Sequence, residues 1–392
     1  MQSLILERAR SLHPQISAWR QALHQIPEIG LELPQTCRLV QDVLREYEIP
    51  FRTLTNSSCV AALLGKPGPC ILLRADMDGL NMEEESGEVF ASVNGCMHAC
   101  AHDVHTASLL GAAVLLKTFE SELCGQVKLL FQPGEEIFAG AAAAIDAGIL
   151  EKPHVDAAFG MHIVPDMRAG VGAFCQMASV YGFQIQLNGV GGHGSNPSVC
   201  ADPITAGVSI HQAFQELIAR ERSLTEEAVL TIGQFSAGDT PNIIPDKAVL
   251  SGTLRTFDDE LAQRLIQRIE NLAKQIAAAY RVEAQVKTFF RGPVLTSSAD
   301  MAELAVQCAK QSGLIQKAIM NCRTAGSEDF AYIVQHVPAA FLSYGCANES
   351  QTPMYGLHHP KVRFSEKLLP QAAATYAIMA IEYLRQRKAP GK

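Results

Sequence analysis

The stretch Gly95-Cys96-Met97-His98-Ala99-Cys100-Ala101-His102-Asp103-Val104-His105-Thr106 places three histidines, two cysteines and an aspartate within twelve positions. Thiolate, imidazole and carboxylate groups bind transition metals. Gly95 and the apolar run that starts near Val104 predict a loop that leads into a helix. In extended backbone Cys100 and His102 lie on one side of the chain, so we expect these two as ligands. On this stretch alone, a helix-capping loop without metal remains the alternative.

Three apolar runs on either side of this loop are each followed by metal-compatible side chains. Residues 70–75 precede Asp76 and Asp78, residues 127–132 precede the pair Glu135-Glu136, and residues 156–161 precede His162. Runs of this kind are typical of strands buried on both faces of a parallel sheet. In open α/β sheets, ligands bind outside the carboxyl ends of the strands. The sequence therefore predicts an α/β domain with a metal site at one edge of its sheet.

The pattern changes after residue 178. Expected strands at 180–188, 227–235, 247–257 and 282–289 alternate with expected helices at 203–222 and 258–280. The order β-α-β-β-α-β is the ferredoxin-like arrangement. We therefore predict a discontinuous catalytic domain, residues 1–178 and 290–392, with an inserted domain at 179–289.

Composition excludes several classes of protein. The 392 residues carry a formal net charge of −8, whereas nucleic-acid binding requires basic clusters. No apolar run approaches the length of a membrane helix, and the first residues do not resemble a signal peptide. Eleven scattered cysteines in a chain of this size favour reduced thiols and a cytoplasmic location.

The adjacent carboxylates Glu135 and Glu136 suit two different tasks. Neighbouring side chains point in different directions, so one can bind metal while the other takes a proton from an attacking water. A site for two ions needs about five protein ligands, one of them shared. Cys100, His102, Glu136 and His162, with His358 or His359, would supply that set.

Nine motifs are spread along nearly the whole chain: residues 74–78, 97–106, 131–136, 160–162, 191–195, 242–245, 252–255, 327–330 and 357–360. In sequence and in order they resemble the motifs of the aminoacylase and glutamate-carboxypeptidase superfamily of dinuclear metallopeptidases. The amidohydrolase branch of that superfamily contains hippurate hydrolases, N-acetyldiaminopimelate deacetylases, N-acetylcysteine deacetylases and auxin-conjugate hydrolases. The resemblance implies a catalytic domain with an open mixed sheet flanked by helices, as in zinc peptidases, and an inserted ferredoxin-like α+β domain that acts as lid and dimerisation domain.

The resemblance also implies a role for each matching residue. Cys100 would bridge two divalent ions. His102, Glu136, His162 and His358 would complete the set of ligands. Mn²⁺ is expected, with Zn²⁺, Ni²⁺ or Co²⁺ as alternatives. Glu135 would be the general base and acid, and Asp78 would orient the site. His193 would stabilise the oxyanion, in the partner subunit of a homodimer or higher oligomer. Asn242 and Arg255 would hold the substrate carboxylate.

Three residues depart from the family pattern. The family usually has glycine where Ala101 stands, and alanine is unstrained there only if its φ is negative. Ser198 and Asn81 stand where histidine and proline are common. None of these changes removes a ligand or the base.

The resemblance implies an enzyme that hydrolyses small N-acyl-L-amino acids, hippurate-like or N-acetylated, to a carboxylic acid and a free amino acid. A dipeptidase or carboxypeptidase of the same superfamily is the alternative. A non-catalytic metal-binding homologue is disfavoured because Glu135 is present. A thiol redox protein is disfavoured because no Cys-x-x-Cys pair occurs.

Overall fold

The computed structural model describes residues 1–55, 57–347 and 354–388. Contacts divide the chain into two compact units. Unit 1 comprises Met1–Cys175, Thr296–Cys322 and Asp329–Lys392, and unit 2 comprises Gln176–Leu295 and Arg323–Glu328. The second unit is thus inserted into the sequence of the first. The short segment 323–328 also belongs to unit 2, although residues 296–322 of unit 1 separate it from the rest of that unit.

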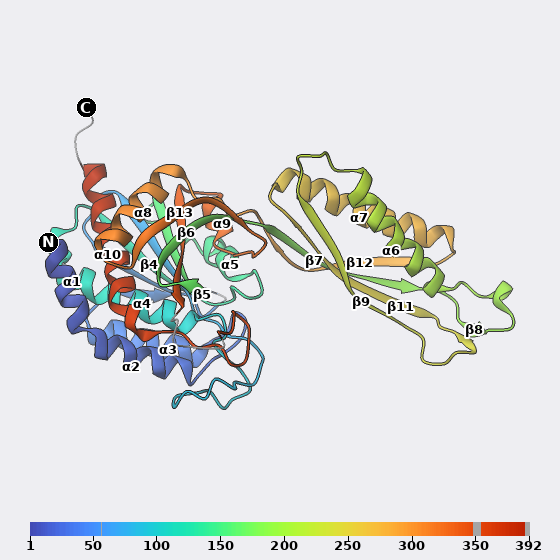
Figure 1. Cartoon of the computed structure of the whole chain (residues 1–392), viewed down its shortest axis with the longest axis horizontal. Coiled ribbons are helices and arrows are strands. Elements are labelled where there is room, and N and C mark those ends of the chain that lie inside the picture. Colours follow the sequence, from blue (N-terminus) through green and yellow to red (C-terminus); the bar gives the residue numbers. More distant parts are fainter. Residues whose placement is uncertain (56, 348–353, 389–392) are drawn as a thin grey trace. The chain divides into compact units, whose positions relative to one another are not determined.

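Unit 1 carries both ends of the chain (Figure 1). It is built on a sheet of eight strands in the order β1-β2-β4-β3-β5-β14-β6-β13. The strands are β1 (Phe51–Thr53), β2 (Val60–Gly65), β3 (Cys70–Asp76), β4 (Gln126–Gln132), β5 (Ala157–Arg168), β6 (Gly170–Met177), β13 (Ile315–Thr324) and β14 (Ala339–Ala347). The four central strands β4, β3, β5 and β14 are parallel, whereas β2 and β6 join them antiparallel. The predicted α/β class with a mixed sheet is confirmed.

The register of the central strands brings the predicted polar residues to one edge. Asp76 pairs with Gln132, the last residue of β4, and Arg74 pairs with Gly160 of β5. The predicted end of β5 at His162 was too early, because the strand continues to Arg168 beside β14. His162 nevertheless lies beyond the point where β3 stops pairing with β5, so it faces the same edge.

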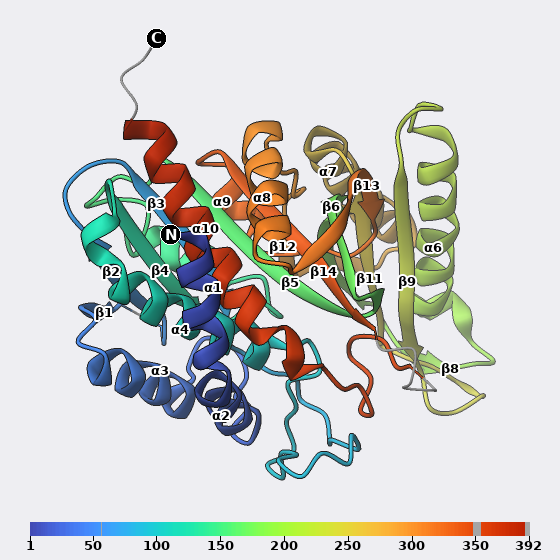
Figure 2. The ribbon, with the colours of Figure 1, turned by 60° about the vertical axis from the view of Figure 1, so that its left-hand side comes forward.

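Helices cover the sheet of unit 1 and bury a largely apolar core. They are α1 (Gln2–Ser11), α2 (His13–His24), α3 (Pro34–Glu46), α4 (His102–Thr118), α5 (Gly140–Asp146), α8 (Ala299–Gln311), α9 (Ala331–Val334) and α10 (Leu369–Lys388), with short 3-10 turns at Glu120–Glu122 and Glu366–Leu368. A third 3-10 turn, Pro197–Val199, belongs to unit 2. Helices α4 and α10 pack on β3 and on each other, with α2 outside α4 and α1 outside α10 (Figure 2). Helices α5 and α9 pack together beside β4 and β14.

Helix α4 positions the predicted ligand His102. From His102 to Leu116 every residue of α4 is buried, which explains why its sequence shows no polar face. The helix begins directly at the predicted ligand His102, so the loop of residues 95–101, which we call the signature loop, leads into it as the sequence predicts.

One predicted helix is divided in two. The spacing of the apolar residues, at a period of about 3.6 residues, predicts a single helix over residues 4–24, but α1 ends at Ser11 and α2 begins at His13. Pro14 occupies the first turn of α2. Proline has no N–H to continue the hydrogen-bond ladder of a preceding helix, and it is well tolerated at a helix start.

Two cysteines form a disulfide, contrary to the expectation of reduced thiols throughout. Cys175 of β6 and Cys322 of β13 are bonded, and the other nine cysteines are free. The two strands are neighbours in the sheet, and the Cα atoms are 4.3 Å apart. Sequence could not indicate this pairing because 147 residues separate the two positions.

Unit 2 contains a four-stranded antiparallel sheet in the order β12-β7-β11-β9. Its elements are β7 (Ser179–Asn188), α6 (Pro203–Arg220), β9 (Ala228–Ala237), β11 (Lys247–Thr256), α7 (Asp259–Ala279) and β12 (Glu283–Gly292), with a small pair β8 (Gly192–His193) and β10 (Ile243–Ile244). The main elements follow the predicted β-α-β-β-α-β order. Asp202 and Asp258 cap α6 and α7 with their side chains.

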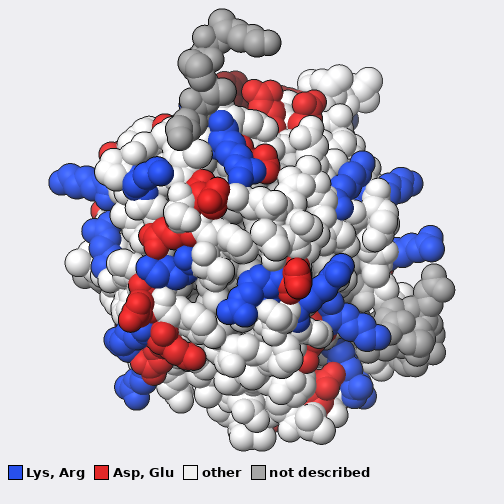
Figure 3. Space-filling view, turned by 90° about the vertical axis from the view of Figure 1, so that its left-hand side faces the viewer, with Lys and Arg blue, Asp and Glu red and all other residues white. Residues whose placement is uncertain are grey.

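Two surface properties bear on the kind of partner. Among the described residues, no helix is both long enough and apolar enough to cross a membrane. On the face drawn in Figure 3, lysine and arginine are interspersed with aspartate and glutamate. That face does not offer the continuous basic surface that nucleic-acid binding requires.

Candidate metal centre

The five predicted metal ligands lie together in unit 1. The ligand atoms of Cys100, His102 and His162 are within 4.8 Å of one another, and so are those of Cys100, Glu136 and His358. Cys100 Sγ lies 3.4 Å from His162 Nε2 and 3.3 Å from His358 Nε2. We call these five residues the Cys100 group. The thiol belongs to both sets of three, which is the arrangement that a ligand shared by two ions requires.

His102 is presented by the first turn of α4 and is buried. Its Nδ1 lies 3.3 Å from Asp78 Oδ1, and its Nε2 lies 3.9 Å from Glu135 Oε2. Neither ring nitrogen makes a well-formed hydrogen bond, and Glu136 Oε1 is likewise buried without one. Buried polar atoms are normally satisfied, so these orphaned atoms within a Cys/His/Glu set fit bound cations.

Glu135 and Glu136 follow β4 through a tight turn at Gly134, whose φ is +73°. Asp78 fixes the pair, because its Oδ1 accepts a hydrogen bond from the Glu135 N–H and its Oδ2 accepts one from the Glu136 N–H, both at 3.1 Å. Glu136 Oε1 lies 3.4 Å from His358 Nε2. The Glu135 carboxylate instead accepts from the Asp329 N–H, so the two side chains point in different directions as predicted.

The loop residues around Cys100 hold unusual backbone conformations. Ala101 has a φ of +65°, so the condition under which alanine would be unstrained at this position is not met. The left-handed conformation costs a residue with Cβ about 1–2 kcal/mol. This left-handed conformation turns the chain at Ala101, directly between Cys100 and His102. We call this turn the chain reversal. His358 has a φ of +62° and donates its N–H to the Ala99 carbonyl, which ties its loop to the same reversal.

The two histidines at 358 and 359 are separated by the structure. His358 joins the Cys100 group, whereas the ring of His359 stacks on Tyr355 with centroids 4.1 Å apart. The residue preferred from the family motif is therefore the one near the thiol.

The electrostatics of the Cys100 group favour protons in the absence of a cation. Burial raises the pKa of the Cys100 thiol, and the neighbouring Cys100 thiol and Glu136 carboxylate raise the pKa of His358 to about 10. Burial opposes a charge on His102, but the Asp76 carboxylate and Asp78 outweigh it and raise the pKa of His102 well above its usual value. Burial lowers the pKa of His162 well below its usual value. A cation that binds here must therefore displace protons.

Sequence reasoning missed a buried ionic cluster behind the signature loop. Asp103 Oδ2 contacts Arg20 Nε at 2.7 Å and His24 Nδ1 at 2.8 Å, and His24 Nε2 lies 3.0 Å from Glu84 Oε1. Burial opposes the charge on His24, but Asp103 and Glu84 raise its pKa to about 9. The cluster joins α2 and the loop at Glu84 to the residue beside His102. Nothing in the spacing of Arg20 and His24 indicated a partner so distant in the chain.

A second missed network supports the ends of β3 and β4. Arg74 donates to Asp76 Oδ2 and to Asp329 Oδ1, both at 2.7 Å, and Gln132 donates to both oxygens of Asp329 at 2.8 Å. All four side chains are buried. The available signal was the presence of charged and amide groups inside apolar strand runs, where burial requires partners.

The three predicted residues of the inserted domain belong to unit 2. His193 of β8 pairs with Ile243 of β10, so Asn242 lies at the adjoining end of that strand pair. The Ser195 N–H donates to His193 Nδ1 at 3.1 Å, which leaves the ring proton on the exposed Nε2. Arg255 of β11 donates to the Ala325 carbonyl at 2.7 Å and to Ser327 Oγ at 2.9 Å.

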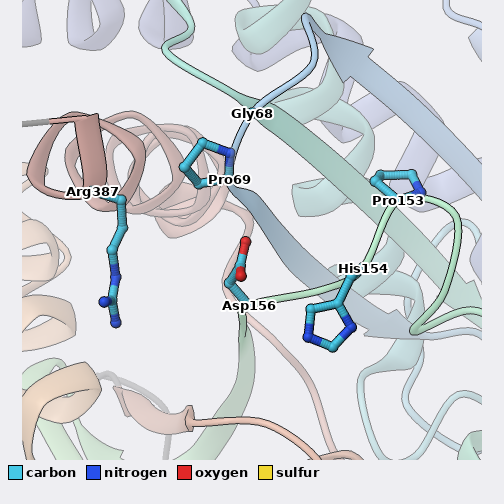
Figure 4. A pocket seen from close by; sticks show the side chains of 6 residues that line it. All are labelled: Gly68, Pro69, Pro153, His154, Asp156 and Arg387. Carbon is cyan, nitrogen blue, oxygen red and sulfur yellow. The ribbon is translucent and has the colours of Figure 1, made fainter.

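A hollow in unit 1 lies at the amino ends of β3 and β5, opposite the carboxyl ends where the Cys100 group lies. Its volume is about 540 Å³. It is lined by Gly68, Pro69, Pro153, His154, Asp156 and Arg387 (Figure 4). The hollow adjoins the first residues of β3 and β5, and Asp156 there accepts a hydrogen bond from the Cys70 N–H. It is distinct from the Cys100 group, which lies at the carboxyl ends.

Comparison with known proteins shows similarity along most of this chain. An N-acetyl-L-cysteine deacetylase of Bacillus subtilis (strain 168) is 36% identical over 369 residues, which cover 93% of this chain and 86% of that one. IAA-amino acid hydrolase ILR1-like 4 of Arabidopsis thaliana is 34% identical over 94% of this chain and 86% of its own. A crystal structure from Bacillus subtilis, described as a dinuclear metal-binding peptidase of the M20 family, superposes with a TM-score of 0.78 at 32% identity, covering 96% of this chain and 99% of that chain.

Residues 72–382 match the sequence model of Peptidase family M20/M25/M40. That span contains every residue of the Cys100 group, together with Glu135 and Asp78. The resemblance inferred from the motifs is confirmed, and this chain belongs to Peptidase family M20/M25/M40.

Proposed function

We propose that this enzyme is a metal-dependent amidohydrolase that cleaves the amide bond of N-acyl-L-amino acids. The observation that carries the proposal is the position of Cys100 Sγ in two overlapping ligand sets, with Glu135 beside them. The deacetylase and the IAA-amino acid hydrolase among the relatives bear names of enzymes that act on N-acylated amino acids. The products would be a carboxylic acid and a free amino acid.

The Cys100 group would hold two divalent ions, with Cys100, His102 and His162 around one and Cys100, Glu136 and His358 around the other. When bound, the ions would polarise the amide carbonyl and lower the pKa of the attacking water. Mn²⁺ is our proposal for the native metal. Zn²⁺, Ni²⁺ and Co²⁺ suit the same mixture of thiolate, imidazole and carboxylate.

Glu135 would move the protons. One of its oxygens accepts from the Asp329 N–H, and Oε2 lies on the side of His102. The carboxylate would take a proton from water as the water oxygen attacks the carbonyl carbon. It would return that proton to the nitrogen as the C–N bond breaks. Asp78 would keep the direction of Glu135 constant because it holds the N–H groups of both glutamates.

Unit 2 would supply substrate contacts and the interface of the dimer. His193 has a donor Nε2–H that suits a developing oxyanion, and Arg255 and Asn242 suit a carboxylate. We propose that unit 2 acts as lid and dimerisation domain and that His193 serves the partner subunit of a homodimer. A cytoplasmic location is proposed because nine of the eleven cysteines are free, and cell fractionation would test it.

Complementation tests the role of His193. His193→Ala is expected to lose on the order of 10²–10³ in rate, as for loss of one oxyanion donor. Mixed with an inactive Glu135→Gln variant and reassembled, it should regain activity, because a heterodimer holds one site with both groups intact. Activity is measured after co-refolding, with heterodimers verified by native mass spectrometry. Verified heterodimers without recovery would exclude action on the partner subunit.

A matched pair of substrates tests the reaction class. N-acetyl-L-leucine and glycyl-L-leucine differ only by the ammonium group of the glycyl residue. The purified enzyme with added Mn²⁺ should hydrolyse the first with the higher kcat/KM, and the same order should hold for hippurate against glycylglycine. The Glu135→Gln variant, purified identically, controls for contaminating peptidases. Preference for the dipeptides would replace the proposal by a dipeptidase.

A further inference from the structure

His105 fills the gap where β3 and β5 separate. The two strands pair as far as Arg74 and Gly160, and beyond that point His105 of α4 lies between them. Its Nδ1 lies 2.6 Å from Asp76 Oδ1, and its Nε2 lies 3.0 Å from the amide nitrogen of Ile163. A backbone N–H can only donate, so Nε2 must accept and the ring proton must be on Nδ1.

Ile163 is the residue that follows the predicted ligand His162. The Ile163 N–H is held by His105, and the Ile163 carbonyl accepts from the Nδ1–H of His162 at 2.8 Å. Because Nδ1 of His162 carries the proton, its Nε2 is left unprotonated, 3.4 Å from Cys100 Sγ. The backbone on both sides of the Ile163 Cα therefore sets the direction of the His162 ring.

Asp76 is itself anchored on every side. Its Oδ2 accepts from Arg74 at 2.7 Å, and its backbone carbonyl accepts from Thr106 Oγ1 at 2.7 Å. Asp76 is fully buried, and Arg74 and His105 are at most 2% exposed. Buried ion pairs add little net stability compared with apolar packing, because each ion loses its hydration. The position of this one, directly behind a candidate ligand, points to a role in holding that ligand.

We propose that His105 is a positioning residue for the metal centre. It fixes the direction in which His162 presents Nε2, through its hydrogen bond to the Ile163 N–H, and Asp76 holds it in the required tautomer. The inference rests on the proposed function of His162 as a ligand. Neighbours that orient a metal-binding histidine typically contribute 10–100-fold to metal affinity, on the order of the effect expected here.

Two substitutions separate the two hydrogen bonds of His105. In His105→Gln the amide oxygen can take the place of Nε2 and accept from the Ile163 N–H. In His105→Asn the amide nitrogen can take the place of Nδ1 and donate to Asp76, but nothing reaches Ile163. We expect His105→Asn to lose about 10–100-fold in affinity for one of two Zn²⁺ ions. His105→Gln should stay near the wild-type affinity.

The measurement is Zn²⁺ competition with a chromogenic chelator, with full-length protein and both stoichiometry and affinity recorded. Ser108→Ala is the matched control, since Ser108 is buried in the same helix and its hydroxyl donates to the Val104 carbonyl. Melting of the metal-free variants shows whether each one folds. Equal losses in the Asn and Gln variants, or no loss in either, would overturn the inference.

His162→Ala distinguishes this failure from failure of the proposed function. If it removes one ion while His105→Asn keeps both at wild-type affinity, only the inference about His105 fails. If His162→Ala also keeps both ions, the proposed ligand set fails. Should His105→Asn not fold, ¹⁵N NMR of the wild-type imidazoles decides. A proton on Nδ1 of His105 with and without Zn²⁺ supports the proposal, and a proton on Nε2 refutes it.

Discussion

Replacing Glu135 with glutamine should lower kcat by on the order of 10²–10⁴-fold, the usual contribution of a general acid–base residue, while both ions stay bound. The amide keeps the size of the side chain and can still accept from the Asp329 N–H. It cannot take a proton from water. The loss should therefore lie in kcat, with metal content by elemental analysis near that of the wild type.

Glu136→Gln is the informative comparison because the two glutamates are adjacent in the chain. Glu136 lies with Cys100 and His358, so the amide should weaken one metal site, and metal should be lost together with activity. Glu122→Gln, outside the centre in a short 3-10 turn, is the control. Equal metal loss from the Glu135 and Glu136 variants would mean that the two roles are assigned wrongly.

The parts of the fold that sequence predicts are those with a strong local signal. The run at residues 70–75 is largely apolar because β3 is buried on both faces, and Asp76 marks its carboxyl end. The peripheral strands β1, β6 and β13 gave no such signal, since β1 has no buried residue and β6 and β13 are buried only in part. Their pairing is set by neighbours distant in the chain.

The site shows the same division between local and distant information. Cys100 and His102 stand out through residue type and spacing, and family motifs supply His162 and His358. The supports do not: His105 was visible in the signature stretch, but its contacts with Asp76 and Ile163 depend on how α4 meets β3 and β5. Ala101 shows a further limit. Its left-handed backbone follows from the chain reversal that brings the thiol and the imidazole together, and an alanine gives no sign of it.

Removal of the ions should abolish amidase activity, and a divalent ion should restore it. The centre contains the orphaned nitrogens of His102 and a thiol shared by two ligand sets, which fit bound cations, and those cations would polarise the amide carbonyl and lower the pKa of the attacking water. The test is dialysis against a chelator, elemental analysis, and titration with Mn²⁺, Zn²⁺, Ni²⁺ or Co²⁺. Full activity in protein shown to be metal-free would refute the metal-dependent mechanism.

The same titration should depend on pH in a defined direction. In the metal-free protein the pKa values of Cys100 and His102 are raised, and that of His358 is raised to about 10, so these groups hold protons at neutral pH. Binding requires a thiolate and neutral imidazoles, so protons must leave. Affinity should therefore fall as pH falls from 8 to 6, roughly the range around neutrality where such competition is strongest. Calorimetry in buffers of different ionisation enthalpy should show proton release.

Cys100→Ser should release fewer protons, because a serine hydroxyl does not exchange its proton for a metal as readily as a thiol does. Binding that is independent of both pH and buffer would show that the ions do not bind at the Cys100 group.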